Sequence, residues 1–408
     1  MTTTTVTTGA LESTTVPSST EPVLELVERA AALRDLLRGH ASEGDNGQVA
    51  DAVVDRLESE GMLRLTVPRR YGGYEVNTRT LVDVLIELAR GDGSTGWAAM
   101  LINIGNWFAT TWLVQAQDEI WGRTPEAKVC VVLNPMTRAE KVEGGYRVSG
   151  RWSFASGSFM ATHAMMGFLA PQTDGTVRHA LGIFHPGEWT VERSWYPLGL
   201  KGTGSDTVVI ESVFIPDHRI QYFDDMVVGD YATELLEVEA RARAPFLPAG
   251  TVIFGAIQIG LGKAAADYAM ERMRTKGVTG TVYTEARNSP VHQLAAAEAL
   301  TKIDAAELLA HRSCKDIDES AESGEYLDEL RRARVRNDTG AIVALVGDAL
   351  DQLLKAAGSG SYLFSSPLSR IYQDQGTGGS HAHATPQVGK EVYGRLLLGA
   401  DGPVTVHV

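Results

Sequence analysis

The segment Gly150–Ser158, "GRWSFASGS", decides how the middle of this 408-residue chain is interpreted. Trp152 and Phe154 alternate with small polar residues, as in a half-buried β-strand. The run Ser156-Gly157-Ser158 then interrupts the alternation. Either this break is a β-bulge that serves packing, or the strand borders a flat molecule that it stacks on and hydrogen-bonds.

The surrounding sequence predicts a mainly α-helical protein with a central β-domain. Six segments between about residues 128 and 217 are rich in β-branched and aromatic residues, which indicates a small barrel or sandwich, and "EGG" at Glu143–Gly145 signals a hairpin. Apolar residues at helical spacing precede and follow this region. Ser94 or Thr95 is the expected cap of the helix that contains Trp97. The predicted parts are a disordered tail (1–22), a helical domain (23–124), the β-barrel (125–223), an irregular linker or lid (224–250) and a four-helix bundle (251–408).

Composition limits the partners and the location. A formal net charge of −14 argues against nucleic acid or an anionic membrane as the main partner. Cys130 and Cys314 are expected to be buried thiols. The Thr/Ser-rich start has neither a basic region nor an apolar core, and we noted no window apolar enough to span a bilayer, so a cytoplasmic location is expected.

The common nucleotide and metal motifs are missing from the sequence. Gly199, Gly202 and Gly204 lack the GxGxxG spacing of a Rossmann site. His381 and His383 are two positions apart and do not share a helix face, so no metal site is predicted.

Several motifs together, in this order, resemble the acyl-CoA dehydrogenase superfamily, and most closely its branch of two-component flavin-dependent monooxygenases. They are "GDGSTGW" (91–97), "GRWSFASGS" (150–158), "WYPLGLKGTGSDTVVIESVFIP" (195–216), "YQDQGTGGSHAHA" (372–384) and "EVYGRLLLG" (391–399). The resemblance implies a helical domain, a central β-barrel and a C-terminal four-helix bundle, assembled as a homotetramer. It also implies that reduced flavin, FAD or FMN, is supplied by a separate NAD(P)H-flavin reductase and reacts with O2 to a flavin hydroperoxide.

The resemblance assigns the flavin to particular residues. Trp152 and Phe154 would shape the pocket of the isoalloxazine ring, and Ser156 would hydrogen-bond near its reactive nitrogen. Thr203 and Ser205 would hold polar groups of the flavin, with a series of tight turns as the alternative.

Two arginines near the end of a predicted helix match positions where the superfamily reaches a neighbouring subunit's flavin phosphate. They are Arg272 and Arg274. Cationic side chains also simply favour a helix C-terminus, so both interpretations stay open.

The reaction is predicted from the segment around residue 375. An acyl-CoA dehydrogenase commonly places a glutamate base before Gly-Thr, whereas this chain has Gln375 before Gly376 and Thr377. Asp374 is expected to point elsewhere. The monooxygenases instead carry a catalytic histidine in this segment, and His381 matches it, with His383 as a second candidate that contacts substrate.

One departure from the aromatic hydroxylases points toward N-oxidation. Many of these relatives have a second histidine just before a tryptophan, where this chain has Gly105 and Asn106 before Trp107. We assign Asn106 and Trp107 to the substrate site. An amine needs no second base, so we expect N-oxidation of a dTDP-linked amino sugar, as in the nitrososynthases of antibiotic biosynthesis. The alternatives are hydroxylation of an aromatic or polyketide carbon, acyl-CoA dehydrogenation, and a flavin-binding structural protein.

Overall fold

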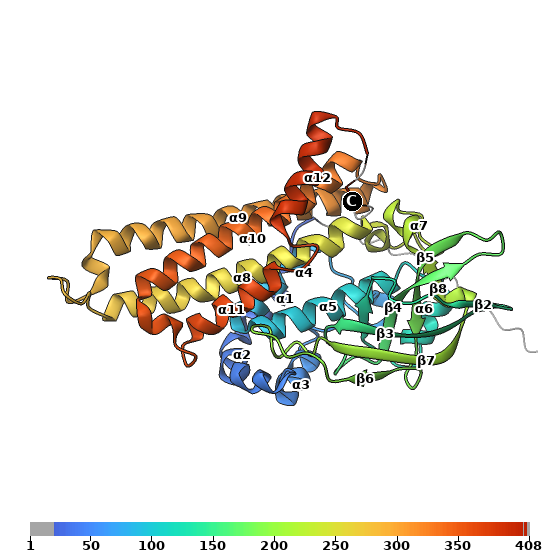
Figure 1. Cartoon of the computed structure of the whole chain (residues 1–408), viewed down its shortest axis with the longest axis horizontal. Helices are drawn as coiled ribbons and strands as arrows, with labels where there is room; N and C mark the ends of the chain where they lie inside the picture. The colour runs from blue at the N-terminus through green and yellow to red at the C-terminus, as the bar shows by residue number, and fades with distance from the viewer. Residues whose placement is uncertain (1–19, 403, 406–408) are drawn as a thin grey trace, which may run out of the picture.

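The computed structural model describes residues 20–402, 404 and 405, so most of the predicted tail lies outside the described residues. Figure 1 shows the long C-terminal helices at one end of the molecule, the strands at the other end, and the N-terminal helices between and below them. This order of helices, strands and helices agrees with the sequence-based prediction.

The N-terminal helices pack mainly through α4 (Thr78–Gly91), most of whose residues are buried, and α5 (Gly93–Ala109), whose residues are almost all buried. Asp92 caps α5, because its carboxylate accepts from the Thr95 backbone N–H at 2.8 Å. The cap predicted at Ser94 or Thr95 is therefore wrong by two or three residues. The helices are α1 (Leu24–Ala32), α2 (Arg34–His40), α3 (Asp51–Ser59), α4 (Thr78–Gly91), α5 (Gly93–Ala109) and α6 (Val114–Trp121).

The strands form two four-stranded sheets in the described chain, in the orders β1-β4-β5-β8 and β2-β3-β7-β6. The hairpin predicted at Glu143–Gly145 is confirmed, since Val142 pairs with Gly145. No strand of one sheet pairs with a strand of the other among the described residues; the nearest link is an isolated bridge from Arg138, just before β2, to Leu169 in β4, so the closed barrel stays a prediction. The strands are β1 (Val129–Val132), β2 (Glu140–Val142), β3 (Gly145–Ala155), β4 (His163–Pro171), β5 (Val177–Phe184), β6 (Thr190–Glu192), β7 (Asp206–Pro216) and β8 (Ile220–Tyr222).

A bulge near the end of β3 answers the first question raised by the sequence. The pairing of β3 with β7 shifts between Trp152 and Ala155, and Phe154 adopts a left-handed backbone with φ of 66°. Trp152 is fully buried and donates from Nε1 to the Gly167 carbonyl at 2.7 Å. Phe154 is 70% exposed. The bulge thus turns the second aromatic side chain away from the core that holds the first.

Three long helices form the C-terminal bundle, with two shorter ones beside them (Figure 1). α11 packs on α8 and α10, and α12, close to the predicted fourth helix, packs on α10. By length and hydropathy α8 could cross a membrane, which we missed in the sequence, but 89% of its apolar window is buried in the protein. These helices are α8 (Phe246–Thr275), α9 (Pro290–Ser323), α10 (Glu329–Ala357), α11 (Pro367–Gly379) and α12 (Pro386–Leu398).

The segment predicted as a linker or lid contains a short helix, α7 (Phe223–Val227), and its last residues already belong to α8. Arg241 fixes its position. Its buried guanidinium hydrogen-bonds the Thr78 hydroxyl and lies 3.8 Å from the Asp318 carboxylate. The backbone carbonyl of Arg241 accepts from Trp107 Nε1 at 2.9 Å. These contacts tie the segment to α4, α5 and α9, as a fixed linker requires.

Candidate active site

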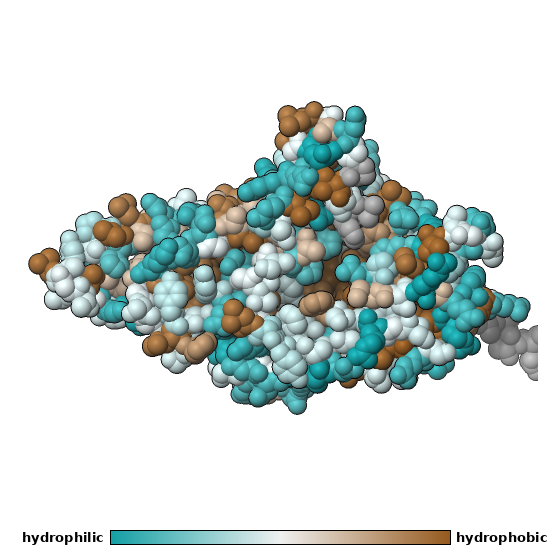
Figure 2. Space-filling view, viewed as in Figure 1, coloured by the Kyte–Doolittle hydropathy of each residue, from teal (hydrophilic) through white to brown (hydrophobic). Residues whose placement is uncertain are grey.

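A cavity of about 490 Å³ lies where α5, α8 and the end of α11 meet the strands. Figure 2 shows a hollow with hydrophobic side chains at this junction. Among the described residues, none that lines the cavity is Asp, Glu, Lys or Arg. The lining comes from α5 (Trp97, Leu101, Ile104, Phe108), the β1 end (Val131, Val132, Leu133, Asn134), the β3 end (Ser153, Phe154, Ser156), loops (Trp195, Leu200, Ser205), α8 (Phe246, Leu247, Gly250, Thr251, Ile253, Phe254) and the α11 end (Thr377, Ser380, His381, Ala382, His383).

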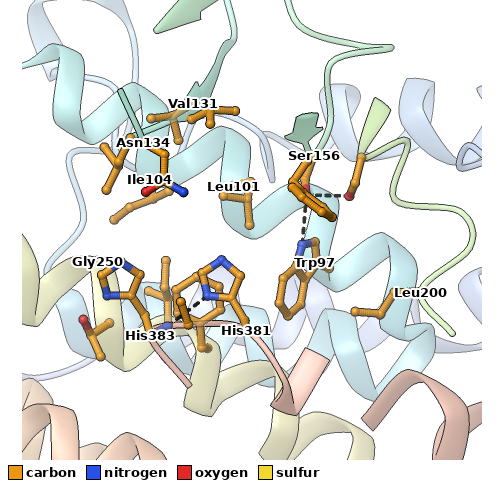
Figure 3. Close-up of a pocket in the computed structure, with 18 of the residues that line it drawn as sticks. Trp97, Leu101, Ile104, Val131, Asn134, Ser156, Leu200, Gly250, His381 and His383 are labelled. Atoms are coloured by element: carbon orange, nitrogen blue, oxygen red, sulfur yellow. Dashed lines mark hydrogen bonds between the residues drawn. The ribbon is translucent and has the colours of Figure 1, made fainter. Parts of the chain in front are cut away.

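A chain of three hydroxyl groups borders one end of the cavity. The Thr203 hydroxyl donates to the Leu200 carbonyl at 2.9 Å and lies 2.7 Å from Ser205 Oγ, which lies 2.6 Å from Ser156 Oγ. Because Thr203 uses its proton on the carbonyl, Ser205 donates to Thr203, and Ser156 donates to Ser205. Trp97 Nε1 in turn donates to Ser156 at 3.1 Å (Figure 3). The oxygen of Ser156 is therefore left as an acceptor for a ligand in the cavity.

His381 is a neutral hydrogen-bond donor in this arrangement. Its ring stacks on Phe254, with centroids 4.2 Å apart, and burial lowers its pKa to about 4. The backbone N–H of His383 points at His381 Nδ1 over 3.3 Å (Figure 3). Since Nδ1 accepts this contact, the single proton of the neutral ring lies on Nε2.

The wall of the cavity carries two strained backbone positions. Phe154 and Leu200 have φ values of 66° and 54°, in the left-handed region that side chains other than glycine rarely adopt. Phe154 makes an edge-on contact with Trp195, with ring centroids 6.0 Å apart. Strain of this kind persists only where the surrounding structure enforces it, and it often accompanies function.

Six predicted site residues do not line the cavity: Thr203, which takes part in the hydroxyl chain behind it, Arg272 and Arg274, which are described below, and three others. Trp152 is fully buried in the β-region, as described above. The amide of Asn106 bonds backbone groups of Leu63 and Val129, both at 3.0 Å, and the Trp107 indole bonds Arg241. All three side chains are 0% exposed, so their assignment to flavin or substrate is corrected.

A second cavity, of about 290 Å³, contains Arg272 at the other end of α8. Lys276, His292 and Lys355 line it as well, which makes it basic. Along α8, eighteen residues from Phe254 to Arg272, about 27 Å of helix, separate the two cavities. Arg274 instead lies at the surface and pairs with Glu271.

The carboxyl groups near the cavity face away from it. Asp374 is buried and accepts from the Leu200 backbone N–H at 2.6 Å, and Gln375 does not line the cavity. Burial and the neighbouring Asp92 raise the pKa of Asp374 to about 7. The expectation that Asp374 points elsewhere is confirmed.

Sequence reasoning missed several cavity residues. Trp97 and Trp195 stand at the ends of the quoted motifs, and that position was the available signal. Asn134 follows an apolar strand and precedes a proline, so it has the sequence context of an ordinary turn residue.

Comparison with known families agrees with this architecture. Residues 25–121 match the acyl-CoA dehydrogenase N-terminal domain, and residues 252–386 match the acyl-CoA dehydrogenase C-terminal domain. The structure of XiaF from Streptomyces sp., in complex with FADH2 and glycerol, is 30% identical with a TM-score of 0.88, and the match covers 94% of this chain and 96% of XiaF. The chain belongs to the acyl-CoA dehydrogenase family, in its branch of two-component flavin-dependent monooxygenases.

The chain also matches curated oxygenases over nearly their whole length. The oxygenase subunit HsaA of a flavin-dependent monooxygenase from Rhodococcus jostii is 28% identical, covering 93% of this chain and 99% of HsaA. The oxygenase component of an FADH2-dependent resorcinol hydroxylase from a Rhizobium species is 27% identical, covering 94% and 97%. The protein is thus an oxidoreductase.

One more distant structure is that of KijD3, in complex with FMN and a dTDP-amino sugar. It is 19% identical with a TM-score of 0.78, covering 94% of this chain and 95% of KijD3, and shows the fold alone.

Proposed function

We propose that the protein hydroxylates a neutral aromatic or polycyclic substrate, using O2 and reduced flavin delivered by a separate NAD(P)H-flavin reductase. The observation that carries this proposal is the apolar, uncharged cavity with Ser156 at one end and His381 at its centre. Reduced flavin, when bound, activates O2 and supplies the transferred oxygen atom. The apolar walls exclude water from that oxygen atom.

The hydroxyl chain fits reduced flavin in particular. The central ring of reduced flavin carries an N–H donor, where oxidised flavin has only an acceptor. Ser156 presents an acceptor to the cavity because its own proton is used on Ser205. We therefore expect the reduced form to bind more tightly than the oxidised form.

Nitrogen oxidation of a dTDP-amino sugar becomes the second candidate. A diphosphate needs cationic partners, and no lysine or arginine of the described chain lines the cavity. The observation in favour of N-oxidation is that α5 turns only Leu101, Ile104 and aromatic side chains toward the cavity, and therefore contributes no second base. A role in antibiotic biosynthesis depends on this candidate.

Acyl-CoA dehydrogenation lacks its base in this site. Removal of the proton next to a thioester requires a carboxylate within reach. No Asp or Glu within residues 20–402 lines the cavity, and the Asp374 carboxyl is held against the Leu200 backbone. A base at the cavity would have to come from a histidine instead.

The second cavity supports a proposal about assembly. Its basic residues, with Arg272 among them, suit a phosphate group of a flavin, FAD or FMN, bound mainly by a neighbouring subunit. A homotetramer would bring such a flavin within reach, and light scattering in solution tests that stoichiometry. A cytoplasmic location stays a prediction.

The reaction is tested with isotopically labelled O2, a flavin reductase and NADH. We expect mass spectrometry to find one labelled oxygen atom in the product of an aromatic probe such as 2-naphthol. Labelled hydroxylamine from a dTDP-amino sugar, without any aromatic product, would favour the second candidate. Consumption of NADH with no labelled product from either substrate class would contradict both.

We expect Ser156→Ala to weaken binding of reduced flavin about tenfold, because one hydrogen bond from the flavin N–H is lost. Anaerobic titration of chemically reduced flavin measures this. Ser158→Ala is the matched control, since Ser158 is buried two residues away and bonds the Gly204 carbonyl outside the cavity. Equal affinities for reduced flavin in the native protein and Ser156→Ala would remove Ser156 from this role.

A further inference from the structure

Asn134, an exposed residue, brings an amide group to the end of the cavity remote from Ser156. It directly follows Val131, Val132 and Leu133, whose side chains also line the cavity. In Figure 3 the oxygen and nitrogen of its side chain point into the open space. Within the part of the chain that the structure describes, the Asn134 side chain makes no hydrogen bond, whereas those of Asn103 and Asn106 are bonded to the backbone.

With this amide at one end and Ser156 at the other, the cavity has two polar ends. Figure 3 shows Ser156 and Trp97 at one end, Asn134 and His383 on facing walls at the other end, and His381 between them. Hydrophobic side chains, among them Leu101, Ile104 and Val131, occupy the walls. A ligand that fills the cavity thus meets hydrogen-bonding groups at both ends and apolar surface along its length.

An amide in such surroundings has a defined preference. Asn134 offers two N–H donors and one carbonyl acceptor, which suit a hydroxyl or keto oxygen. It carries no charge, so it does not favour a carboxylate or a phosphate as a cationic side chain would. Asn134 is an exposed residue, so solvent reaches its amide in the free protein. A ligand without a polar group there would displace this solvent without replacing its hydrogen bonds, which is unfavourable.

We propose that Asn134 is a specificity-determining residue, which binds a hydroxyl or keto oxygen at the end of the substrate remote from Ser156. This proposal rests on the proposed function, because it takes the substrate to be a neutral ring system. It selects, among such compounds, those that carry oxygen at both ends.

The test compares two probes that differ by one distal hydroxyl group, 2-naphthol and naphthalene-2,6-diol. Their binding is measured by quenching of protein fluorescence, without turnover. We expect the native protein to bind the diol about tenfold more tightly than 2-naphthol, as one hydrogen bond to a neutral amide allows. In Asn134→Leu, which keeps the branched shape of the side chain but has no hydrogen-bonding group, the two affinities should become equal while 2-naphthol binding is retained.

Ile104→Leu is the matched control, since it reshapes the same wall without an amide and should keep the preference for the diol. Asn134→Ala repeats the test if the leucine variant does not fold. A native protein without preference, or a preference that persists in both Asn134 variants, would overturn the inference. Because these are binding measurements, they are independent of the labelled-oxygen experiment, and failure of one is distinguishable from failure of the other.

Discussion

His381→Ala should lower product formation about a thousandfold while NADH consumption and release of hydrogen peroxide continue. The variant removes the Nε2 proton donor at the centre of the cavity, and positioned acid–base groups typically contribute a factor of about 10² to 10⁴. His381→Gln returns an N–H donor and should recover part of the loss. Product yield per NADH consumed is the measurement.

The environment of His381 also fixes its pH behaviour. A pKa of about 4 keeps the ring neutral throughout the physiological range. We therefore expect no change in product yield that is linked to His381 between pH 6 and pH 8. Loss of flavin binding as large as the loss of product formation would instead make His381 a structural residue. His383→Ala distinguishes the two imidazoles, because it removes the one that stacks farther from Phe254 and keeps His381.

Asp374→Asn should stabilise the protein at pH 8 by up to about 4 kcal/mol and leave it unchanged near pH 4. The folded pKa of Asp374, about 7, lies above its ordinary value of 3.8. The folded protein thus holds a proton that the unfolded chain releases, so this group makes the fold less stable as pH rises from about 4 to 7. Asparagine cannot ionise, and its oxygen still accepts from the Leu200 N–H.

Three charged groups act on Asp374 besides burial. Asp92 and Asp45 raise its pKa and Arg370 lowers it. Thermal unfolding at pH 5 and pH 8 measures the difference between variant and native protein. Asp45→Asn is a control of opposite sign, because its hydrogen bond to Arg370 lowers the pKa of Asp45, so its loss should destabilise the neutral protein. An Asp374→Asn protein no more stable than the native one at pH 8 would contradict the prediction.

The order of domains could be predicted because apolar spacing differs between helices and strands along most of the chain. Four site residues predicted from the quoted motifs do line one cavity: Phe154, Ser156, Ser205 and His381. The direction in which individual side chains point was harder to predict. One extra residue in β3 turns Phe154 away from the core that holds Trp152, and an alternating pattern does not reveal where such a residue is inserted.

The substrate end of the site was the least predictable part. α5 is buried on nearly every side, so its sequence does not show which face borders the cavity, and Asn106 and Trp107 proved to face the core. The role that we propose for Asn134 depends on what surrounds it in space. Those neighbours come from α5, β1, α8 and the α11 end, which are far apart in the sequence.

The left-handed backbones of Phe154 and Leu200 restrict how this site can evolve. Glycine at either position would relax the main chain and favour folding, but it would also remove a side chain from the wall of the cavity. Other residues would keep the strain and change the shape. A change of substrate specificity is therefore easier to reach by substitutions at unstrained wall positions such as Ile104 and Val131. Substitutions of Phe154 and Leu200 should be tolerated less often.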